Sequence, residues 1–165
     1  RLRFITSHPW DLSDRLIAAM AECASVCEHL HLPVQSGDDA VLKRMGRQYT
    51  IEHYLERLAR IRDAVPGITL STDVIVGFCG ETDAEYEDTL RLLETIRYDQ
   101  VFSAAYSERP GTPATKLVDD VPAAEKRRRR KRNWALPWPA WSGARSAFGP
   151  SVRMTGLRCR TCGAR

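Results

Sequence analysis

The chain has 165 residues, of which 43% are hydrophobic and 28% are charged, a composition typical of one soluble globular domain. No stretch approaches the roughly 18 to 20 consecutive apolar residues that a membrane-spanning helix needs, which excludes a transmembrane protein and predicts no membrane partner. The net charge of +4 is unevenly distributed. Residues 1–125 carry 21 Asp and Glu against 13 Lys and Arg, whereas residues 126–165 carry 12 Lys and Arg and no acidic residue. This change predicts a domain boundary at residue 125.

The start of the chain and its cysteines indicate its context. The chain opens on a strand-like run with neither an initiator Met nor a signal peptide, so we expect it to begin within a larger protein. Its cysteines are odd in number and too scattered for the disulfide scaffold of a secreted domain, which predicts a reducing, cytoplasmic location. The five are Cys23, Cys27, Cys79, Cys159 and Cys162.

Residues 1–125 alternate between strand-like and helix-like hydrophobic periods, a pattern typical of βα units rather than of a helical bundle or a β-sandwich. The pattern is weakest in the second strand, because Pro33 has no N–H for a sheet ladder. In chain order we expect a strand at 2–6, a helix at 14–26, a strand at 29–34, helices at 40–45 and 51–65, a strand at 68–78, a helix at 83–96 and a strand at 100–106.

Short polar side chains that precede the helical periods predict where the helices begin. These side chains accept hydrogen bonds from the free N–H groups of a first helical turn. The expected N-caps are Ser13 or Asp14, Asp38 or Asp39, Thr50, and Thr82 or Asp83.

The βα units recur about every 35 residues, which leaves room for right-handed crossovers between parallel strands. A closed barrel of eight such units needs about 250 residues. The predicted fold class is therefore α/β, and we expect residues 1–125 to form a partial, half TIM-like barrel. Two sheet edges would lack neighbours, which predicts an unstable or aggregation-prone chain.

The segment 126–165 has no strand or helix period, and prolines and glycines interrupt it. We expect an irregular basic tail rich in Trp, Pro and Arg, for which three interpretations remain open. It is a disordered basic tail, an out-of-frame read of a GC-rich gene, or a nucleic-acid-binding segment. In the third case residues 127–132 contact phosphates and the tryptophans Trp134, Trp138 and Trp141 stack on bases.

Parallel βα folds bind ligands at the carboxyl ends of their strands, which selects residues 7–9, 35–39, 76–82 and 107–113. The Gly-rich segment from Gly77 to Thr82 either lets a ligand approach bare backbone or is only a tight turn. The pair Gln35 and Ser36 either bonds a sugar hydroxyl or caps a turn. Two basic residues on the next predicted helix, Arg44 and Arg47, either clamp a carboxylate or are solvated.

A metal site is not expected. His29 and His31 lie on the same side of a strand and His8 follows the first strand, but no further ligand stands at a known spacing. Cys159 and Cys162 resemble half of a zinc knuckle without its second pair of thiols.

Four segments together resemble a known family: RFITSHP, HLHLPVQSGDDAVLKRMGRQYT, RIRDAVPGITLSTDVIVGFCGET and YSERPGTPA. In this order and spacing they resemble the radical-SAM tRNA methylthiotransferases, the MiaB-like family, from residue 1 to about residue 128. The amino-acid sequences of these segments are most similar to those of the branch that makes 2-methylthio-N6-dimethylallyladenosine next to the anticodon. Cys79 departs from the family, which usually has proline in GFPGET.

The resemblance implies a radical-SAM barrel, of which this chain holds the C-terminal half. It implies transferase activity with tRNA as partner, and S-adenosylmethionine (SAM) and 4Fe-4S clusters as cofactors. In this family a cluster cleaves SAM to a radical that abstracts the hydrogen at adenine C2, and sulfur and a methyl group follow. The cluster cysteines would precede residue 1, so we expect this chain to ligate no cluster and to be inactive alone.

The resemblance also implies site residues. Gln35 and Ser36 match a pair near the SAM ribose, and Arg47 matches a basic residue near the SAM carboxylate. An apolar stretch that packs on adenine corresponds to Val74, Ile75, Val76 and Gly77. Further candidates for the active face are His8, Asp73, Glu81 and Arg109. The alternative function, from another class, is a non-catalytic RNA-binding protein that acts through the basic tail.

Overall fold

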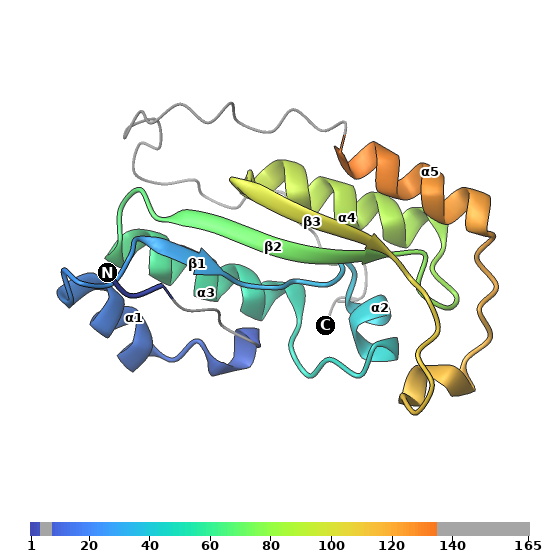
Figure 1. Ribbon diagram of the computed structural model, residues 1–165, viewed down its shortest axis with the longest axis horizontal. Helices are drawn as coiled ribbons and strands as arrows, with labels where there is room; N and C mark the ends of the chain where they lie inside the picture. The colour runs from blue at the N-terminus through green and yellow to red at the C-terminus, as the bar shows by residue number, and fades with distance from the viewer. Residues whose placement is uncertain (4–7, 135–165) are drawn as a thin grey trace, which may run out of the picture.

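A computed structural model describes residues 1–3 and 8–134 of the chain (Figure 1). Its centre is a three-stranded parallel sheet in the order β1-β2-β3 that is not closed into a barrel. This arrangement confirms the α/β class and agrees with a partial barrel. The elements are η1 (Pro9–Asp11), α1 (Asp14–Glu22), β1 (His29–His31), α2 (Asp39–Arg44), α3 (Ile51–Ala64), β2 (Thr69–Val76), α4 (Asp83–Ile96), β3 (Gln100–Ala105), η2 (Pro113–Lys116) and α5 (Ala123–Trp134).

The elements from α2 to β3 were predicted to within two residues, but the N-terminal elements differ. Of the first predicted strand, residues 4–7 lie outside the described part, and Leu2 forms only an isolated parallel bridge with Val26. Helix α1 ends at Glu22, four residues before the predicted end. The N-caps are Ser13, Asp38, Thr50 and Thr82, each accepting a bond from a first-turn N–H, as predicted.

The strand register gives the sheet one helix-covered face and one open face. Leu70, Val74 and Val76 of β2 are buried in the same core as side chains of α3 and α4, which lie together against the sheet (Figure 1). The alternate positions of each strand point to the opposite face. On this open face the register places Asp73 next to Phe102, whose side chain is half exposed. The residues of the open face are His29, His31, Ser71, Asp73, Ile75, Phe102 and Ala104.

Strand β1 ends early because Pro33 interrupts its ladder with β2, and side chains bond the backbone groups on either side of the proline. The Thr72 hydroxyl accepts from the Val34 N–H at 2.9 Å and donates to the Leu32 carbonyl at 2.8 Å. The Tyr54 hydroxyl donates to the same carbonyl at 2.7 Å. Since all these groups are buried, the side chains replace the ladder without leaving polar atoms unpaired.

Helix α5 corrects the prediction of an irregular segment from residue 126 onward, because a regular helix runs from Ala123 to Trp134. It packs beside α4 and against β3, where the Asn133 amide donates to the Ser103 hydroxyl at 3.1 Å (Figure 1). The helix lacks an apolar stripe, so hydrophobic periodicity gave no signal for it. Trp138, Trp141, Cys159 and Cys162 lie outside the described residues, and the predictions for residues 135–165 remain predictions.

We expect the substitution Thr72→Val to lower the free energy of unfolding of the chain by about 1–3 kcal/mol, because the buried Val34 N–H loses its acceptor. Urea denaturation monitored by circular dichroism measures the change. The matched control is Thr95→Val on the exposed surface of α4, for which we expect a change within about 0.5 kcal/mol. Equal losses from the two substitutions would show that the Thr72 hydroxyl does not stabilise the break at Pro33.

Candidate functional site

The carboxyl ends of β1, β2 and β3 lie at one edge of the sheet, on the side of α2 (Figure 1). Three of the four predicted segments follow these strands, namely residues 35–39, 76–82 and 107–113. The fourth, residues 7–9, is described only from His8 onward. We call the strand ends and the first two of these segments the carboxyl edge.

Gln35 is the most unusual residue of the carboxyl edge. Its backbone has φ of +67°, a conformation that residues other than glycine seldom adopt. The Gln35 N–H donates to the Asp73 carbonyl and the Gln35 carbonyl accepts from the Ile75 N–H, both at 2.9 Å, so β2 holds the residue in place. Only 9% of Gln35 is exposed, yet its side-chain amide has no hydrogen-bond partner among the described residues. A strained, buried residue with a free amide is suited to bind a polar ligand.

Ser36 has a structural role in the same loop. Its fully buried hydroxyl lies 3.3 Å from the Thr89 hydroxyl and accepts from the Asp38 N–H at 3.3 Å. The neighbouring Gly37 packs so closely on α4 that an added Cβ would lie 2.4 Å from the Thr89 Cα. These contacts favour the interpretation of Ser36 as a loop-fixing residue, and its proximity to a ribose stays a prediction.

Arg44 and Arg47 do not act as one clamp. Arg44 forms a bidentate ion pair with Glu85, at 3.0 and 2.9 Å, and these hydrogen bonds raise the pKa of the Arg44 guanidinium. Arg47 is half-buried and forms no ion pair within the described part of the chain. Of the two cations, Arg47 is therefore the one available to an anionic ligand.

The apolar stretch at the end of β2 presents fewer side chains than the sequence indicated. Val74 and Val76 are fully buried in the core under the sheet, so only Ile75 faces the open side. Gly77 has φ of +70°, and an added Cβ would lie 2.4 Å from Cγ of Lys126. The absence of a side chain at Gly77 thus serves the packing of α5, which is a different reason from ligand approach.

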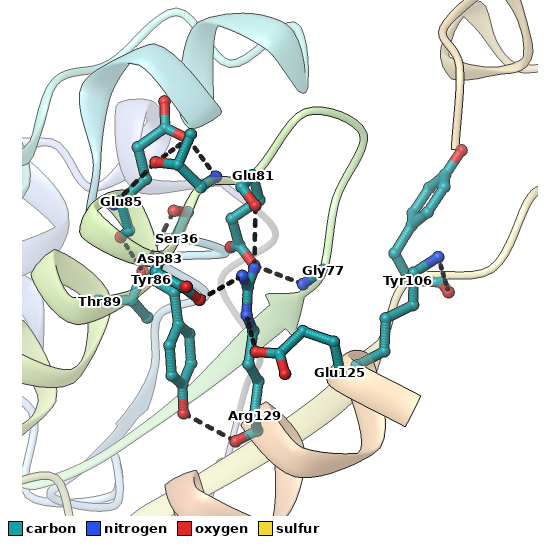
Figure 2. A network of polar contacts seen from close by, with 12 residues as sticks. Ser36, Gly77, Glu81, Asp83, Glu85, Tyr86, Thr89, Tyr106, Glu125 and Arg129 are labelled. Carbon is teal, nitrogen blue, oxygen red and sulfur yellow. Dashed lines mark hydrogen bonds and ion pairs between the residues drawn. The ribbon is translucent and has the colours of Figure 1, made fainter. Parts of the chain in front are cut away.

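Glu81 lies in a buried network rather than on the open face (Figure 2). Its carboxylate accepts from the Gly77 N–H at 2.6 Å and from the Arg129 guanidinium at 2.7 Å. Arg129 also donates to Asp83 at 2.8 Å and to Glu125 at 2.9 Å. Burial raises the pKa of Glu81, while the bonds from Gly77 and Arg129 act in the opposite direction. The second carboxylate oxygen, Oε1, has no partner among the described residues.

The other predicted residues of the active face lie apart from one another. Asp73 lies on the open face, with its carboxylate 3.4 Å from Nε2 of His31. His8 precedes η1, where its ring accepts from the Trp10 N–H and contacts the Tyr49 ring edge-on. Arg109 is exposed in the loop after β3. No hydrogen bond or ion pair joins Asp73, His8 and Arg109 to one another.

A polar cluster on the open face, formed by His29, His31, Ser71 and Asp73, was not predicted from the sequence. Nδ1 of His31 lies 2.9 Å from the Ser71 hydroxyl, and Nε2 of His29 lies 3.4 Å from it. The Phe102 ring contacts His31 edge-on. A period of two in the sequence could have predicted the cluster. His29 and His31 lie two positions apart on one strand, and Ser71 and Asp73 lie two positions apart on the next, so each pair points to one face of the sheet. Among the described residues no group of three or more His, Cys, Asp or Glu side chains is arranged to hold a metal ion.

A 4Fe-4S cluster does not fit the described part of the chain. A CxxxCxxC loop that began at Cys23 and Cys27 would need a third cysteine at position 30, where Leu30 is fully buried. Cys79 is buried beside Phe78 and belongs to a small apolar cluster. The described residues do offer side chains of the kinds that SAM requires, namely the Gln35 amide, the Arg47 cation and the apolar Ile75, and their contact with SAM stays a prediction.

The basic run 127–132 is largely engaged with the protein itself. Arg129 and Arg132 form ion pairs with acidic residues of α4 and its N-terminal loop. Arg128 pairs with Glu125 one turn earlier in α5. Pairing of this kind reduces the positive charge that the run presents to a polyanion. Nonspecific nucleic-acid binding by residues 127–132 stays a prediction.

The described helices include none with the length and apolar character needed to cross a membrane. Comparison with known proteins identifies relatives over most of the chain. A protein named tRNA-2-methylthio-N(6)-dimethylallyladenosine synthase from Chlorobium chlorochromatii is 55% identical over 130 residues, which cover 78% of this chain and 29% of the relative. Proteins of the same name from Anoxybacillus flavithermus and Thermus thermophilus are 52% identical over 136 residues and 51% identical over 132 residues. These matches cover 82% and 80% of this chain, and 26% and 28% of the relatives.

The chain thus spans less than a third of the length of these relatives. The match to the relative from Anoxybacillus flavithermus covers 82% of the chain and includes α5 wherever it begins, so the basic helix belongs to the part that resembles this relative. Residues 1–93, which extend from the N-terminus into α4, match the Radical SAM superfamily. Because this match covers more than half of a chain with a parallel βα sheet, the chain belongs to the radical SAM superfamily.

Proposed function

We propose that this chain forms the SAM-binding half-barrel of a tRNA methylthiotransferase that acts on N6-dimethylallyladenosine. One observation carries the proposal. About four-fifths of the chain aligns with synthases named for this product, and about half of the aligned residues are identical. The carboxyl edge supports it, because a parallel βα sheet binds its ligand there. The cytoplasm, where tRNA is modified, is the proposed location.

The resemblance assigns to SAM and its 4Fe-4S cluster the chemistry of the reaction, a radical substitution at adenine C2. The residues of this chain bind and orient SAM in our proposal. The Gln35 amide bonds the ribose hydroxyls, since it is held by β2 and has no other partner. Arg47 pairs with the carboxylate. Ile75 contributes the apolar surface against which the adenine packs.

The alternative function, RNA binding through the basic segment alone, has less support. Three of the cations in the run 127–132 are ion-paired within the protein. The family match covers the βα part of the chain, which this alternative treats as an inert scaffold. We therefore propose that the βα part acts on tRNA, and we do not propose that the basic run binds it.

The proposed substrate is tested on the tRNA of the source organism. Deletion of the coding sequence of this chain should abolish 2-methylthio-N6-dimethylallyladenosine and lead to accumulation of N6-dimethylallyladenosine, because the methylthio group is added last. Mass spectrometry of nucleosides from digested tRNA measures both. Restoring the deleted sequence is the control. An unchanged nucleoside profile in the deletion strain would refute the proposed substrate.

SAM binding by the proposed site is tested with Arg47→Ala. We expect the substitution to raise the Kd of the chain for SAM about 10- to 100-fold, because a charge-assisted bond to the carboxylate is lost. Equilibrium dialysis with radiolabelled SAM measures the Kd. The control is Arg15→Ala on α1, an exposed arginine without an ion pair in the described structure, which should leave the Kd unchanged. An equal Kd for the two variants would remove Arg47 from the proposed site.

We also propose that the chain by itself does not cleave SAM, since its described residues offer no cluster site. The chain should form no 5′-deoxyadenosine after reconstitution with iron and sulfide and reduction with dithionite. Chromatography of the reaction mixture measures this product. The full-length relative from Thermus thermophilus, treated in the same way, is the positive control. Formation of 5′-deoxyadenosine by the chain would contradict the proposal.

A further inference from the structure

Helix α5 reaches the carboxyl edge at Gly77, the residue that directly follows β2. The Gly77 N–H cannot continue the sheet ladder beyond the end of β2, and it donates instead to the Glu81 carboxylate at 2.6 Å. Glu81 is therefore the group that sets the direction of the backbone as it leaves the strand. The preceding residues include Ile75, whose N–H bonds the Gln35 carbonyl, so the contact lies in the same stretch of backbone as the proposed ligand site.

Glu81 depends on Arg129 to hold this bond. Its side chain is 1% exposed, and a carboxylate so buried is stable only when it is paired and hydrogen-bonded. Nη1 of Arg129 donates to the carboxylate at 2.7 Å and to the Glu81 main-chain carbonyl at 3.0 Å, which fixes both the side chain and the turn (Figure 2). Within the described chain, the other polar contact of the Glu81 carboxylate is the Gly77 N–H itself.

Arg129 is in turn held from three sides, so it acts as a fixed point rather than as a mobile surface side chain. Its own side chain is 4% exposed. Asp83 and Glu125 accept from its remaining guanidinium nitrogens, and its guanidinium lies 5.2 Å from the centre of the Tyr86 ring (Figure 2). The Tyr86 hydroxyl lies 2.8 Å from the Arg129 carbonyl, which also ties α5 to α4.

A second residue of α5, Lys126, packs against Gly77. The Lys126 stem occupies the position where a Cβ of Gly77 would lie, and its Nζ donates to Asp119 and to the Tyr106 carbonyl just after β3. Lys126 therefore fixes Gly77 from one side while Arg129, through Glu81, fixes its N–H from the other.

We propose that Arg129 is a positioning residue for the carboxyl edge: by anchoring Glu81 it holds the Gly77 N–H and the end of β2 in the arrangement that binds SAM. The identity of the ligand rests on the proposed function, whereas the anchoring of Gly77 does not. Arg129 touches no ligand in this assignment, and its effect is transmitted by one carboxylate and one backbone N–H.

The test compares Arg129→Met with Arg128→Met in the 165-residue chain. Arg128 lies on the same helix, is about half exposed and pairs with Glu125, so its substitution removes a cation without touching Glu81. Two quantities are measured in folded protein: the hydrogen-exchange rate of the Gly77 amide by NMR, and the Kd for radiolabelled SAM. A role in folding alone would accelerate exchange equally at a buried amide of the sheet, so the rate at Gly77 is taken relative to that of Leu32, whose N–H bonds the Ser71 carbonyl. Such a role would leave the Kd of the folded fraction unchanged.

We expect Arg129→Met to accelerate exchange at Gly77 at least about 10-fold and to raise the Kd for SAM about 10-fold, while Arg128→Met changes neither. Unchanged exchange at Gly77 in folded Arg129→Met would overturn the proposal. Faster exchange with an unchanged Kd would overturn it as well, because the anchor would then not affect the ligand. If the unsubstituted chain binds no SAM, the proposed function fails, and the exchange rate alone decides the anchoring of Gly77.

A charge-neutral variant covers the case in which Arg129→Met does not fold because it leaves a buried carboxylate unpaired. The double substitution Glu81→Gln with Arg129→Met leaves no buried charge at either position. Its glutamine carbonyl can still accept from the Gly77 N–H but has no guanidinium to anchor it. We expect the double variant to fold and to show the same acceleration at Gly77, and native-like exchange there would overturn the proposal.

Discussion

The described structure depends on strand β2, which forms backbone hydrogen bonds with a strand on each side and buries one face in the core. Its pairing with β3 is continuous over six residues, whereas its pairing with β1 is interrupted by Pro33. The interruption is tolerable only because the Thr72 hydroxyl stands where a ladder bond is missing. Beyond the break, β2 pairs with the backbone of Gln35 and positions this residue at the carboxyl edge in a strained conformation.

Local signals accounted for most of the fold. Helix starts were predictable because a capping side chain and the N–H that it accepts are at most three residues apart. The central strand β2 was predictable because residues 68–78 are rich in Val, Ile and Leu, which has few alternatives in a βα pattern. Helix α5 was not, since its stability comes from pairs such as Arg132 with Glu87 and Arg129 with Glu81, which lie more than 40 residues apart.

The candidate site was predictable in place but not in detail. The rule for parallel sheets predicts a ligand site at the strand ends, where Gln35 has a side chain free to bind a ligand; Arg47, after α2, also has no ion pair among the described residues. Ser36, Val74, Val76 and Glu81 share the same segments, yet they face the protein interior. Periodicity cannot distinguish these cases in a loop, where the direction of a side chain depends on tertiary contacts. The segments that follow the strands were therefore predictable from the sequence, whereas the direction of each side chain needed coordinates, and the ligand site itself stays a prediction.

The contact of Lys126 with Gly77 also affects how related sequences should be compared. A glycine after the central strand of a βα sheet is commonly attributed to a bound ligand, but here the side chain of another helix occupies the space. The two positions are therefore expected to covary: a larger residue at 77 is compatible only with a shorter stem at 126 and with a residue that tolerates φ of +70°. In a protein that lacks the C-terminal helix the space beside position 77 would be open, and the φ of +70° alone would still favour glycine there.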